Sequence, residues 1–457
     1  MNEERSRMLG NMDVKKLLIK LSIPAIIAMM VNALYNLVDT VFIAWGAGEI
    51  AIGALAIAFP VQMIVLAIGI MIGIGSASVF SRAYGRGDED AMVRSVNTAI
   101  FLNLLLSVFV SVVTYIFLEE LLYFFGASSG NIDYAREYLL FILVALPPFS
   151  LSIVLNNLTR AEGRPHIAMI SLIIGAGLNI LLDPFFIFDF GLGLGVRGAA
   201  IATAISKSVS FIYVFSRALG PNSALAIRLR TIYKLDLKMA YEIVTVGMPT
   251  FVRNTLGAIL VVIVNRLINH YAPMNPEIYV SIYGVITRLI MFTLMPGFGL
   301  VQGLQPIVGF NYGAEFHRRL FDVISFTTRL LFGYLFGVTV LVLLFARPLF
   351  ILFSPDVDEV FVENGATAFR IVALGFSMIT FQILLSSVYQ AMGYAFRAFL
   401  VAVSRQFVLF IPLAFMFTYL FSVRGIWLAF VAADVTAGAL SLLVYLYEMK
   451  DLKQKIV

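Results

Sequence analysis

Two acidic residues, Asp39 and Asp183, lie inside long apolar segments of the chain, where ionisable side chains are rare. A charged group at the centre of a membrane helix costs about 2.5–3.5 kcal/mol on insertion scales, so such residues are candidates for function. Asn36 precedes Asp39 by three residues, which places both on one helix face. Asn179 likewise precedes Asp183 by four, and Thr203 begins a later apolar segment at the same expected depth. These five residues are predicted to converge on one polar site.

Such a site suits a small cation. Two close carboxylates in a low dielectric repel each other, so one of them readily takes up a proton. A sodium ion could instead be held at Asp39, Asn179 and Asp183, because carboxylate and amide oxygens are hard ligands. Pro184 is expected to break the helix directly after Asp183 and to allow a bend. The structural alternative is that the polar groups only bond one another and hold the helices together. No cofactor is expected apart from a coupling ion, H⁺ or Na⁺.

The elements that must position these residues are membrane helices. Hydrophobic residues make up 61% of the 457 and charged residues 13%, which excludes a disordered or a nucleic-acid-binding protein. A membrane helix needs about 20 mainly apolar residues, whereas a β-barrel would show short alternating strands. Continuous apolar runs such as residues 61–75 do not alternate. We therefore predict an all-α integral membrane protein with twelve transmembrane helices, over residues 17–44, 52–80, 96–118, 132–158, 167–188, 198–219, 241–270, 280–308, 321–346, 362–390, 399–420 and 426–447.

The basic residues predict how these helices are oriented. The loops and ends on one side of the predicted membrane hold 21 Lys and Arg residues, against three on the other side, Arg197, Arg347 and Arg424. Because basic loops stay in the cytoplasm, both termini are expected there, with the protein a multi-pass component of the plasma (inner) membrane. This distribution also accounts for the net charge of +5 without a nucleic-acid partner. The chain has no cysteine, which excludes disulfides and thiolate metal sites.

The two halves of the chain share motifs at spacings of 225 to 230 residues, the largest between Arg160-Ala161-Glu162-Gly163 and Gln390-Ala391-Met392-Gly393. Each half has six predicted spans that start on the same side. This pattern predicts two six-helix lobes related by pseudo-twofold symmetry about an axis near the membrane normal, a design typical of transporters with alternating access. We assign residues 1–216 to the N-terminal lobe, 217–240 to a cytoplasmic linker and 241–457 to the C-terminal lobe. The matched motifs are Pro24 with Pro249, Ala83-Tyr84-Gly85 with Asn311-Tyr312-Gly313, Pro184 with Pro412, and Val196-Arg197-Gly198 with Val423-Arg424-Gly425.

The C-terminal half does not repeat the two acids. Its spans carry several arginines, and its mid-span acid, Asp434, is interpreted as one partner of a structural ion pair. In the N-terminal half, Lys207 could be a counter-ion to Asp183 or could extend toward the membrane surface. Flexible methionines and aromatic rings suit a cleft that accepts varied solutes, although core or lipid contact is the commoner role for any single one. The predicted substrate cavity comprises Tyr35, Asn36, Met63, Arg253, Met291 and Gln382.

Motifs along essentially the whole chain resemble those of the multidrug and toxic compound extrusion (MATE) family. The resemblance implies a secondary active transporter that exports organic cations and other drugs in exchange for H⁺ or Na⁺, by alternating access of two lobes. The motifs are Pro24, Asn36-Leu37-Val38-Asp39, Asn156-Asn157-Leu158-Thr159-Arg160-Ala161-Glu162-Gly163-Arg164-Pro165, Asn179-Ile180-Leu181-Leu182-Asp183-Pro184 and Gly195-Val196-Arg197-Gly198-Ala199-Ala200.

Within the family, the DinF/MepA-like branch is the most similar. Its acidic network in the N-terminal lobe falls here on Asp39, Asn179 and Asp183, with Asn156 and Thr203 as further members. NorM-type members instead use a glutamate in the seventh span and an aspartate in the tenth. This sequence reads Thr-Phe-Val-Arg-Asn over residues 250–254 and has Gln382 but no mid-span acid in the tenth span. The departure favours a coupling site in the N-terminal lobe.

Two other function classes stay open at this point. A flippase for lipid-linked precursors, from the same superfamily, would share the two lobes and need a strongly cationic cavity, for which Arg253 and Arg266 are candidates. An intramembrane enzyme is disfavoured, because the sequence has no HExxH, GxSxG or GxGD motif and no P-loop. We expect small organic cations as substrates, contact with membrane lipid, no nucleic acid and a monomer.

Overall fold

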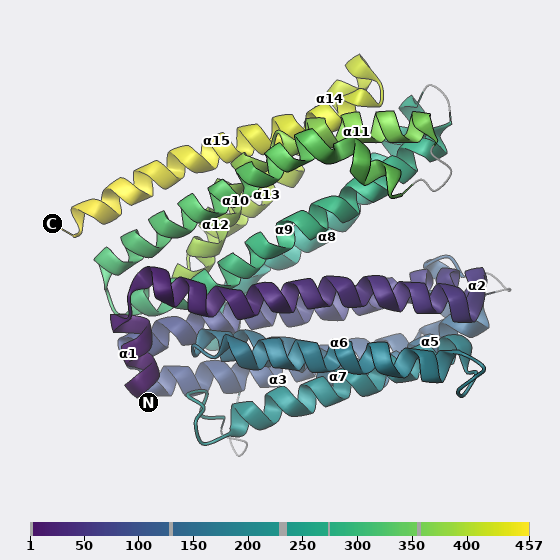
Figure 1. Cartoon of the computed structure of the whole chain (residues 1–457). Coiled ribbons are helices and arrows are strands. Elements are labelled where there is room, and N and C mark those ends of the chain that lie inside the picture. The colour runs from purple at the N-terminus through teal and green to yellow at the C-terminus, as the bar shows by residue number, and fades with distance from the viewer. Residues whose placement is uncertain (1–2, 128–130, 228–234, 273–274, 354–357, 457) are drawn as a thin grey trace.

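A computed structural model describes residues 3–127, 131–227, 235–272, 275–353 and 358–456, and no strand occurs within these ranges. The helices form two bundles, α1–α7 and α8–α15, that lie beside each other (Figure 1). Helix α1 and the last turns of α15 lie at the same end of the molecule, here named the terminal end; the opposite end is the distal end. The predicted all-helical fold with two lobes is confirmed.

The N-terminal lobe is built from seven helices in the described ranges. Two of them begin with an acidic cap: the Asp13 side chain accepts the backbone N–H of Lys16, and the Asp88 side chain accepts that of Ala91. The helices are α1 (Glu3–Asn11), α2 (Val14–Arg86), α3 (Glu89–Ile116), α4 (Leu118–Phe124), α5 (Ile132–Ala161), α6 (Pro165–Ile187) and α7 (Gly195–Leu219).

The C-terminal lobe follows after residues 220–236. Its elements are α8 (Leu237–Tyr271), α9 (Pro276–Gly313), α10 (His317–Ile351), α11 (Glu359–Ala373), α12 (Phe376–Met392), α13 (Ala395–Val403), the π-helix η2 (Ser404–Phe410), α14 (Ile411–Phe421) and α15 (Arg424–Gln454).

Two spans of the C-terminal lobe are interrupted. Helices α11 and α12 meet at an angle of 48° and together form the tenth predicted span. Within the eleventh, η2 separates α13 from α14. Pro412 lies at the start of α14 and has no N–H with which to close an ordinary helical bond, so the preceding turn widens. In the described part of the chain, eleven helices, or twelve if the bent pair is one span, are long and apolar enough to cross a membrane.

Helix α2 contains two spans because the chain reverses within it. A straight helix of its 73 residues would be about 110 Å long, several times the hydrocarbon thickness of about 30 Å. Instead, Ser22 and Ser81 lie against one short stretch of α9: Cβ atoms added to Gly303 and Gly309 would stand 2.2 Å and 2.6 Å from these two side chains. The two apolar stretches of α2 are Val14–Tyr35 and Ile57–Arg86.

Glycines bring the backbones of the two lobes into contact at the terminal end. A Cβ atom added to Gly75 on α2 would stand 1.9 Å from the carbonyl oxygen of Ile243 on α8. One added to Gly247 on α8 would stand 1.9 Å from the carbonyl oxygen of Met71 on α2. No side chain fits at this crossing, so the second span of α2 and α8 approach as closely as two helices can.

The first span of α2 crosses α9 in the same way. A Cβ atom on Gly299 would stand 2.6 Å from the Cα of Ile26, and one on Gly303 would overlap the backbone and hydroxyl of Ser22. The Ser22 hydroxyl also donates a hydrogen bond to the carbonyl oxygen of Leu300, at 3.2 Å. The two crossings are equivalent under the sequence repeat. We name their glycines the glycine seal: Gly75, Gly247, Gly299 and Gly303.

The duplicated Tyr-Gly motif lies where the two lobes meet. A Cβ atom on Gly85 would stand 2.0 Å from the carbonyl oxygen of Phe310, and one on Gly313 would stand 2.1 Å from that of Arg82. Gly85 and Gly313 are 228 residues apart, as are Arg82 and Phe310. Each contact is therefore the image of the other under the pseudo-twofold axis, which passes between them.

Toward the distal end the two lobes separate. If α2 and α9 stayed paired beyond the glycine seal, Leu34 would face Met291; these side chains are 54% and 59% exposed. If α2 and α8 stayed paired, Phe59 would face Ile259; these are 54% and 45% exposed. Figure 1 shows the same divergence, with α8 and α9 leaving α2 away from the terminal end. The lobes enclose a V-shaped cleft that is closed at the terminal end and open at the distal end.

The substitution Gly247→Ala is expected to weaken the contact at the terminal end. The added methyl would overlap the Met71 carbonyl oxygen, and overpacking of this kind costs about 1–3 kcal/mol. The fraction of molecules with an open distal cleft should fall. The rate at which a membrane-impermeant maleimide labels Met291→Cys, in a chain without native cysteine, should therefore fall several-fold. Gly333→Ala is the matched control, since nothing lies within 4 Å of its added Cβ. An unchanged labelling rate in Gly247→Ala would contradict this role of the seal.

Candidate cation site

Three of the predicted site residues meet in the interior of the N-terminal lobe. The side-chain nitrogen of Asn179 on α6 donates hydrogen bonds to Asp183 Oδ1, at 3.0 Å, and to Thr203 Oγ1 on α7, at 3.3 Å. Asp183 is fully buried and Asn179 is 1% exposed. The helical spacing of four residues puts the amide and the carboxyl on one face of α6, and the packing of α6 on α7 brings Thr203 to them.

Asp39 on α2 completes the cluster. Its carboxyl group is in contact with the carboxyl group of Asp183. Three oxygens, Asp39 Oδ1, Asp183 Oδ2 and Asn179 Oδ1, are buried without a hydrogen-bond donor among the described residues. Buried acceptors normally find a donor or a cation. The four residues Asp39, Asn179, Asp183 and Thr203 are called the acidic cluster below.

Helix α6 does not end at Pro184, contrary to the sequence prediction. It continues to Ile187 with Pro184 inside it. In this last turn, the carbonyl oxygen of Pro184 accepts a hydrogen bond from the backbone N–H of Phe188, at 3.3 Å. A proline removes only its own N–H from the helical ladder, so one further turn is possible when its carbonyl still finds a donor.

Lys207 on α7 lies between two aromatic rings beside the acidic cluster. Its Nζ is 4.7 Å from the centre of the Tyr35 ring and 4.8 Å from that of the Phe149 ring. Cation–π contacts of this kind hold a charged group away from water. Asp39 is the acid with which Lys207 interacts electrostatically. The lysine is therefore neither extended to the membrane surface nor a direct partner of Asp183.

Two tyrosines enclose the acids, and one of them was not singled out from the sequence. The hydroxyl of Tyr35 lies beside Thr203. Tyr138 on α5 accepts a hydrogen bond from the side-chain nitrogen of Gln62, at 3.3 Å, and its hydroxyl faces Asp39. Gln62 and Tyr138 could have been noticed in the sequence, because they are polar residues within apolar segments. Their hydrogen bond joins residues 76 apart in the chain and could not be predicted without the tertiary structure.

Asn156 does not join the acidic cluster, although the resemblance placed it there. It lies five residues before the end of α5, whereas Asn179 lies fourteen residues after the start of α6. Since a tight turn joins these antiparallel helices, Asn156 is about 13 Å nearer the terminal end. Asn156 is buried, and no described interaction connects its side chain to the cluster.

The predicted substrate-cavity residues divide among several places. Met63 and Met291 lie exposed where the lobes diverge. Tyr35 is buried in the N-terminal lobe beside the acidic cluster and does not line the cleft. Arg253 and Gln382 line a separate cavity inside the C-terminal lobe. The side chain of Asn36 falls outside the described residues. The five described residues therefore do not line one common cavity in this structure, because helix rotation turns Tyr35 and Gln382 into their own lobes.

The mid-span acid of the C-terminal lobe has the partner expected for it. Asp434 is buried on α15 and forms an ion pair with Arg405 of η2, which donates through its Nε. Among the described mid-span residues, the C-terminal lobe therefore has no acid without a basic partner that would correspond to the acidic cluster of the N-terminal lobe.

The acidic cluster fits a proton or a sodium ion. The described residues contain no group of three or more His, Cys, Asp or Glu side chains that could hold a metal ion. A sodium site would therefore rest on Asp39, Asp183 and the oxygens of Asn179 and Thr203, and three of these oxygens are without a donor. A proton shared between the two carboxyl groups would satisfy the same geometry.

Segments in both lobes match the model of a known protein family. The MatE family model matches residues 24–185 and 249–416, one segment in each lobe. This chain belongs to the MatE family. The resemblance seen in the sequence motifs is thereby confirmed.

Relatives cover nearly the whole chain. The multidrug export protein MepA of Staphylococcus haemolyticus is 28% identical over 450 residues, which span 97% of this chain and 96% of that protein. A solved structure described as the outward-facing conformation of a multidrug resistance MATE family transporter of the MOP superfamily has a TM-score of 0.90 and 25% identity, and covers 98% of both chains. A MATE protein in complex with MaL6 has a TM-score of 0.89 and 25% identity, over 98% of this chain and 99% of that one.

The substitution Asn179→Ala is expected to destabilise the acidic cluster. It removes the nitrogen that bonds both Asp183 and Thr203 and leaves their buried oxygens without a donor, a loss of about 1–3 kcal/mol. The thermal unfolding midpoint of the purified protein should fall by several degrees. Asn222→Ala, at an exposed amide outside the spans, is the control and should leave the midpoint unchanged. Equal midpoints for the two variants would show that the amide contributes no net stability.

Proposed function

We propose that this protein is a secondary active multidrug exporter, which moves organic cations and other small molecules out of the cell in exchange for inward H⁺ or Na⁺. The observation that carries the proposal is the contact of two acids, the buried Asp183 and the partly buried Asp39, in one lobe of a two-lobed cleft. Membership in the MatE family and similarity to proteins named for multidrug export support it. The protein acts as a monomer surrounded by lipid.

The proposed orientation follows from the charges. With both termini in the cytoplasm of a cell bounded by the plasma (inner) membrane, the glycine seal closes the cytoplasmic side and the cleft opens outward. The similarity to an outward-facing MATE structure supports the same assignment. The exchange of this state for an inward-open one would break the seal and close the distal cleft.

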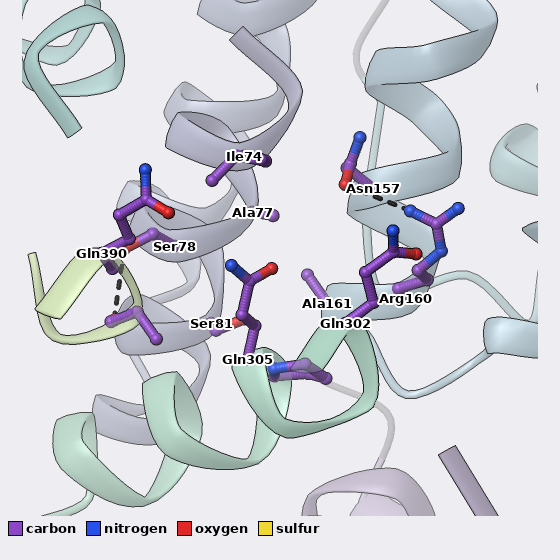
Figure 2. A pocket seen from close by; sticks show the side chains of 12 residues that line it. Ile74, Ala77, Ser78, Ser81, Asn157, Arg160, Ala161, Gln302, Gln305 and Gln390 are labelled. Carbon is purple, nitrogen blue, oxygen red and sulfur yellow. Dashed lines mark hydrogen bonds between the residues drawn. The ribbon is translucent and has the colours of Figure 1, made fainter. Parts of the chain in front are cut away.

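The cytoplasmic end of the cleft is lined by polar groups that suit an aqueous passage. Figure 2 shows Gln302 and Gln305 of the C-terminal lobe near Asn157 and Arg160 of the N-terminal lobe at a small pocket, which Gln390 also lines, beside Ser78. Arg160 donates to Asn157 Oδ1 at 3.2 Å, while its Nε and Gln302 Oε1 are buried without described partners. Groups of this kind would be hydrated once the seal opens, which lowers the free-energy cost of opening.

The proposed cycle links the acidic cluster to drug release. In the outward-open state a proton or sodium ion from outside binds at Asp39 and Asp183, neutralises one negative charge and so weakens the attraction of the lobe for a cationic drug. The drug leaves, and the loaded cluster favours closure of the distal cleft. One charge that crosses 100 mV supplies about 2.3 kcal/mol, or roughly a fifty-fold concentration ratio.

Neutral substitutions of the two acids test the coupling role. Asp39→Asn and Asp183→Asn should each reduce ethidium efflux at least ten-fold in a host that lacks its own pumps, because neither amide can take up the coupling charge. Asp189→Asn, at an exposed acid in the α6–α7 connection, should retain the original efflux at equal protein amounts. Efflux by both cluster variants at the level of the unsubstituted protein would refute the coupling role.

The coupling ion is distinguished in proteoliposomes by a pH gradient and a Na⁺ gradient imposed separately. If the two carboxyls share a proton, a pH gradient alone drives substrate uptake into inside-out vesicles. If the oxygens of the acidic cluster hold sodium, a Na⁺ gradient alone does so. Transport under neither gradient would contradict antiport.

A flippase for lipid-linked precursors is the second candidate, since the C-terminal lobe encloses Arg253 and Arg405. A pyrophosphate needs several unpaired cations, whereas Arg405 is paired with Asp434. The cavity therefore holds one net positive charge among its described groups, which favours the exporter. Scrambling of a fluorescent lipid pyrophosphate by proteoliposomes, with no drug efflux, would reverse this choice.

A further inference from the structure

The C-terminal lobe contains a cavity that the proposed cation cycle does not use. It lies inside that lobe between α8, α9, α12, α13 and η2, and has about 440 Å³ of empty space, part of it open to the surroundings. Part of its lining, here called the apolar wall, is hydrophobic, and the rest, the polar wall, is polar and basic. The apolar wall includes Leu294, Phe298, Ile379 and Ile383, and the polar wall Arg253, Gln382, Arg405 and Gln406.

The charge of this cavity is unbalanced because of one arginine. Arg405 is neutralised by its ion pair with Asp434. Arg253 has no described hydrogen bond or ion pair; its guanidinium lies 5.9 Å from the centre of the Phe298 ring. The other acids of the helices around it are far along the chain: Glu242 lies eleven residues earlier on α8, about 16 Å away along the axis, and Glu277 begins α9. An arginine within a membrane lobe is costly unless it has a partner.

The cavity also offers uncharged hydrogen-bonding groups. Gln382 is held in place by its side-chain nitrogen, which donates to the carbonyl oxygen of Val401 at 3.3 Å. Gln406 Oε1 is buried without a described partner. Gln406 reaches toward α8 over Gly257, where an added Cβ would stand 3.9 Å from its nitrogen. The π-helix η2 places Arg405 and Gln406 in succession on the wall of the same cavity, and short π segments frequently occur at functional sites.

We propose that this cavity binds a small amphiphile with one negative charge, a carboxylate on an aromatic or aliphatic body, whose carboxylate pairs with Arg253. A bidentate guanidinium–carboxylate pair satisfies the unpaired charge. The apolar wall accepts the body, and the side-chain nitrogen of Gln406 donates a hydrogen bond to the carboxylate. The site lies in the opposite lobe from the acidic cluster and does not depend on the proposed antiport.

The test uses the full-length purified protein and three probes: 2-naphthoate, 2-naphthamide and acetate. Radiolabelled 2-naphthoate should bind to the protein. In competition with it, 2-naphthamide, which lacks the charge, and acetate, which lacks the ring, should each bind at least ten-fold more weakly than unlabelled 2-naphthoate. Binding of the amide as tight as that of the naphthoate would overturn the role of charge. Binding of acetate as tight would overturn the amphiphile class. This comparison needs no variant, so it holds even where a substitution prevents folding.

Variants locate the binding to the cavity. Arg253→Gln should lower naphthoate affinity at least ten-fold, and Arg253→Lys should restore part of it. Arg266→Gln removes an exposed arginine from the same helix and should leave the affinity unchanged. Unchanged affinity in Arg253→Gln would overturn the proposal. Asp183→Asn should bind naphthoate normally even without efflux, so failure of the antiport proposal and failure of this one give different results.

Discussion

The arrangement of the whole protein depends on backbone contact between the lobes at the glycine seal. At Gly75 and Gly247 the facing carbonyl oxygens occupy the space where a Cβ would stand, so the helices meet with no side chain between them. Contact of this kind cannot loosen gradually, because closely packed backbone does not compress: the two helices are either in contact or apart. It therefore holds the lobes as two rigid bodies joined at one end, and the cleft beyond the seal is its consequence.

Helix α2 links this seal to the acidic cluster. The same span carries Ser22 and Ile26, which cross α9, and Asp39, which lies against Asp183. The thirteen residues from Ile26 to Asp39 cover about 20 Å along the axis. A change of charge at the cluster thus acts on a continuous helix whose other end belongs to the interface between the lobes. In the proposed transport cycle, α2 would supply the physical connection between the coupling site and the interface of the lobes.

The two lobes share their packing and differ in their electrostatics. Gly85 and Gly313 make equivalent contacts across the axis, whereas the polar sites inside the lobes differ in charge: Asp39 and Asp183 form the site of the N-terminal lobe, and Arg253 lines that of the other. Duplication preserves contacts that need small residues at fixed spacing, because any larger residue there separates the lobes. Positions inside a single lobe are free of that constraint, and each lobe has acquired its own polar site.

The sequence alone determined the membrane helices, the duplication and the pairing of Asn179 with Asp183, since these follow from hydropathy, spacing and the period of one helix. It also identified the ion pair of Asp434. Only the tertiary structure decided that Asn156 lies about 13 Å nearer the terminal end than Asn179, that Lys207 lies between Tyr35 and Phe149, and that Arg253 lines a cavity of its own. The reason is physical: local sequence sets which residues share a helix face, but the rotation and depth of each helix are set by contacts between segments far apart in the chain.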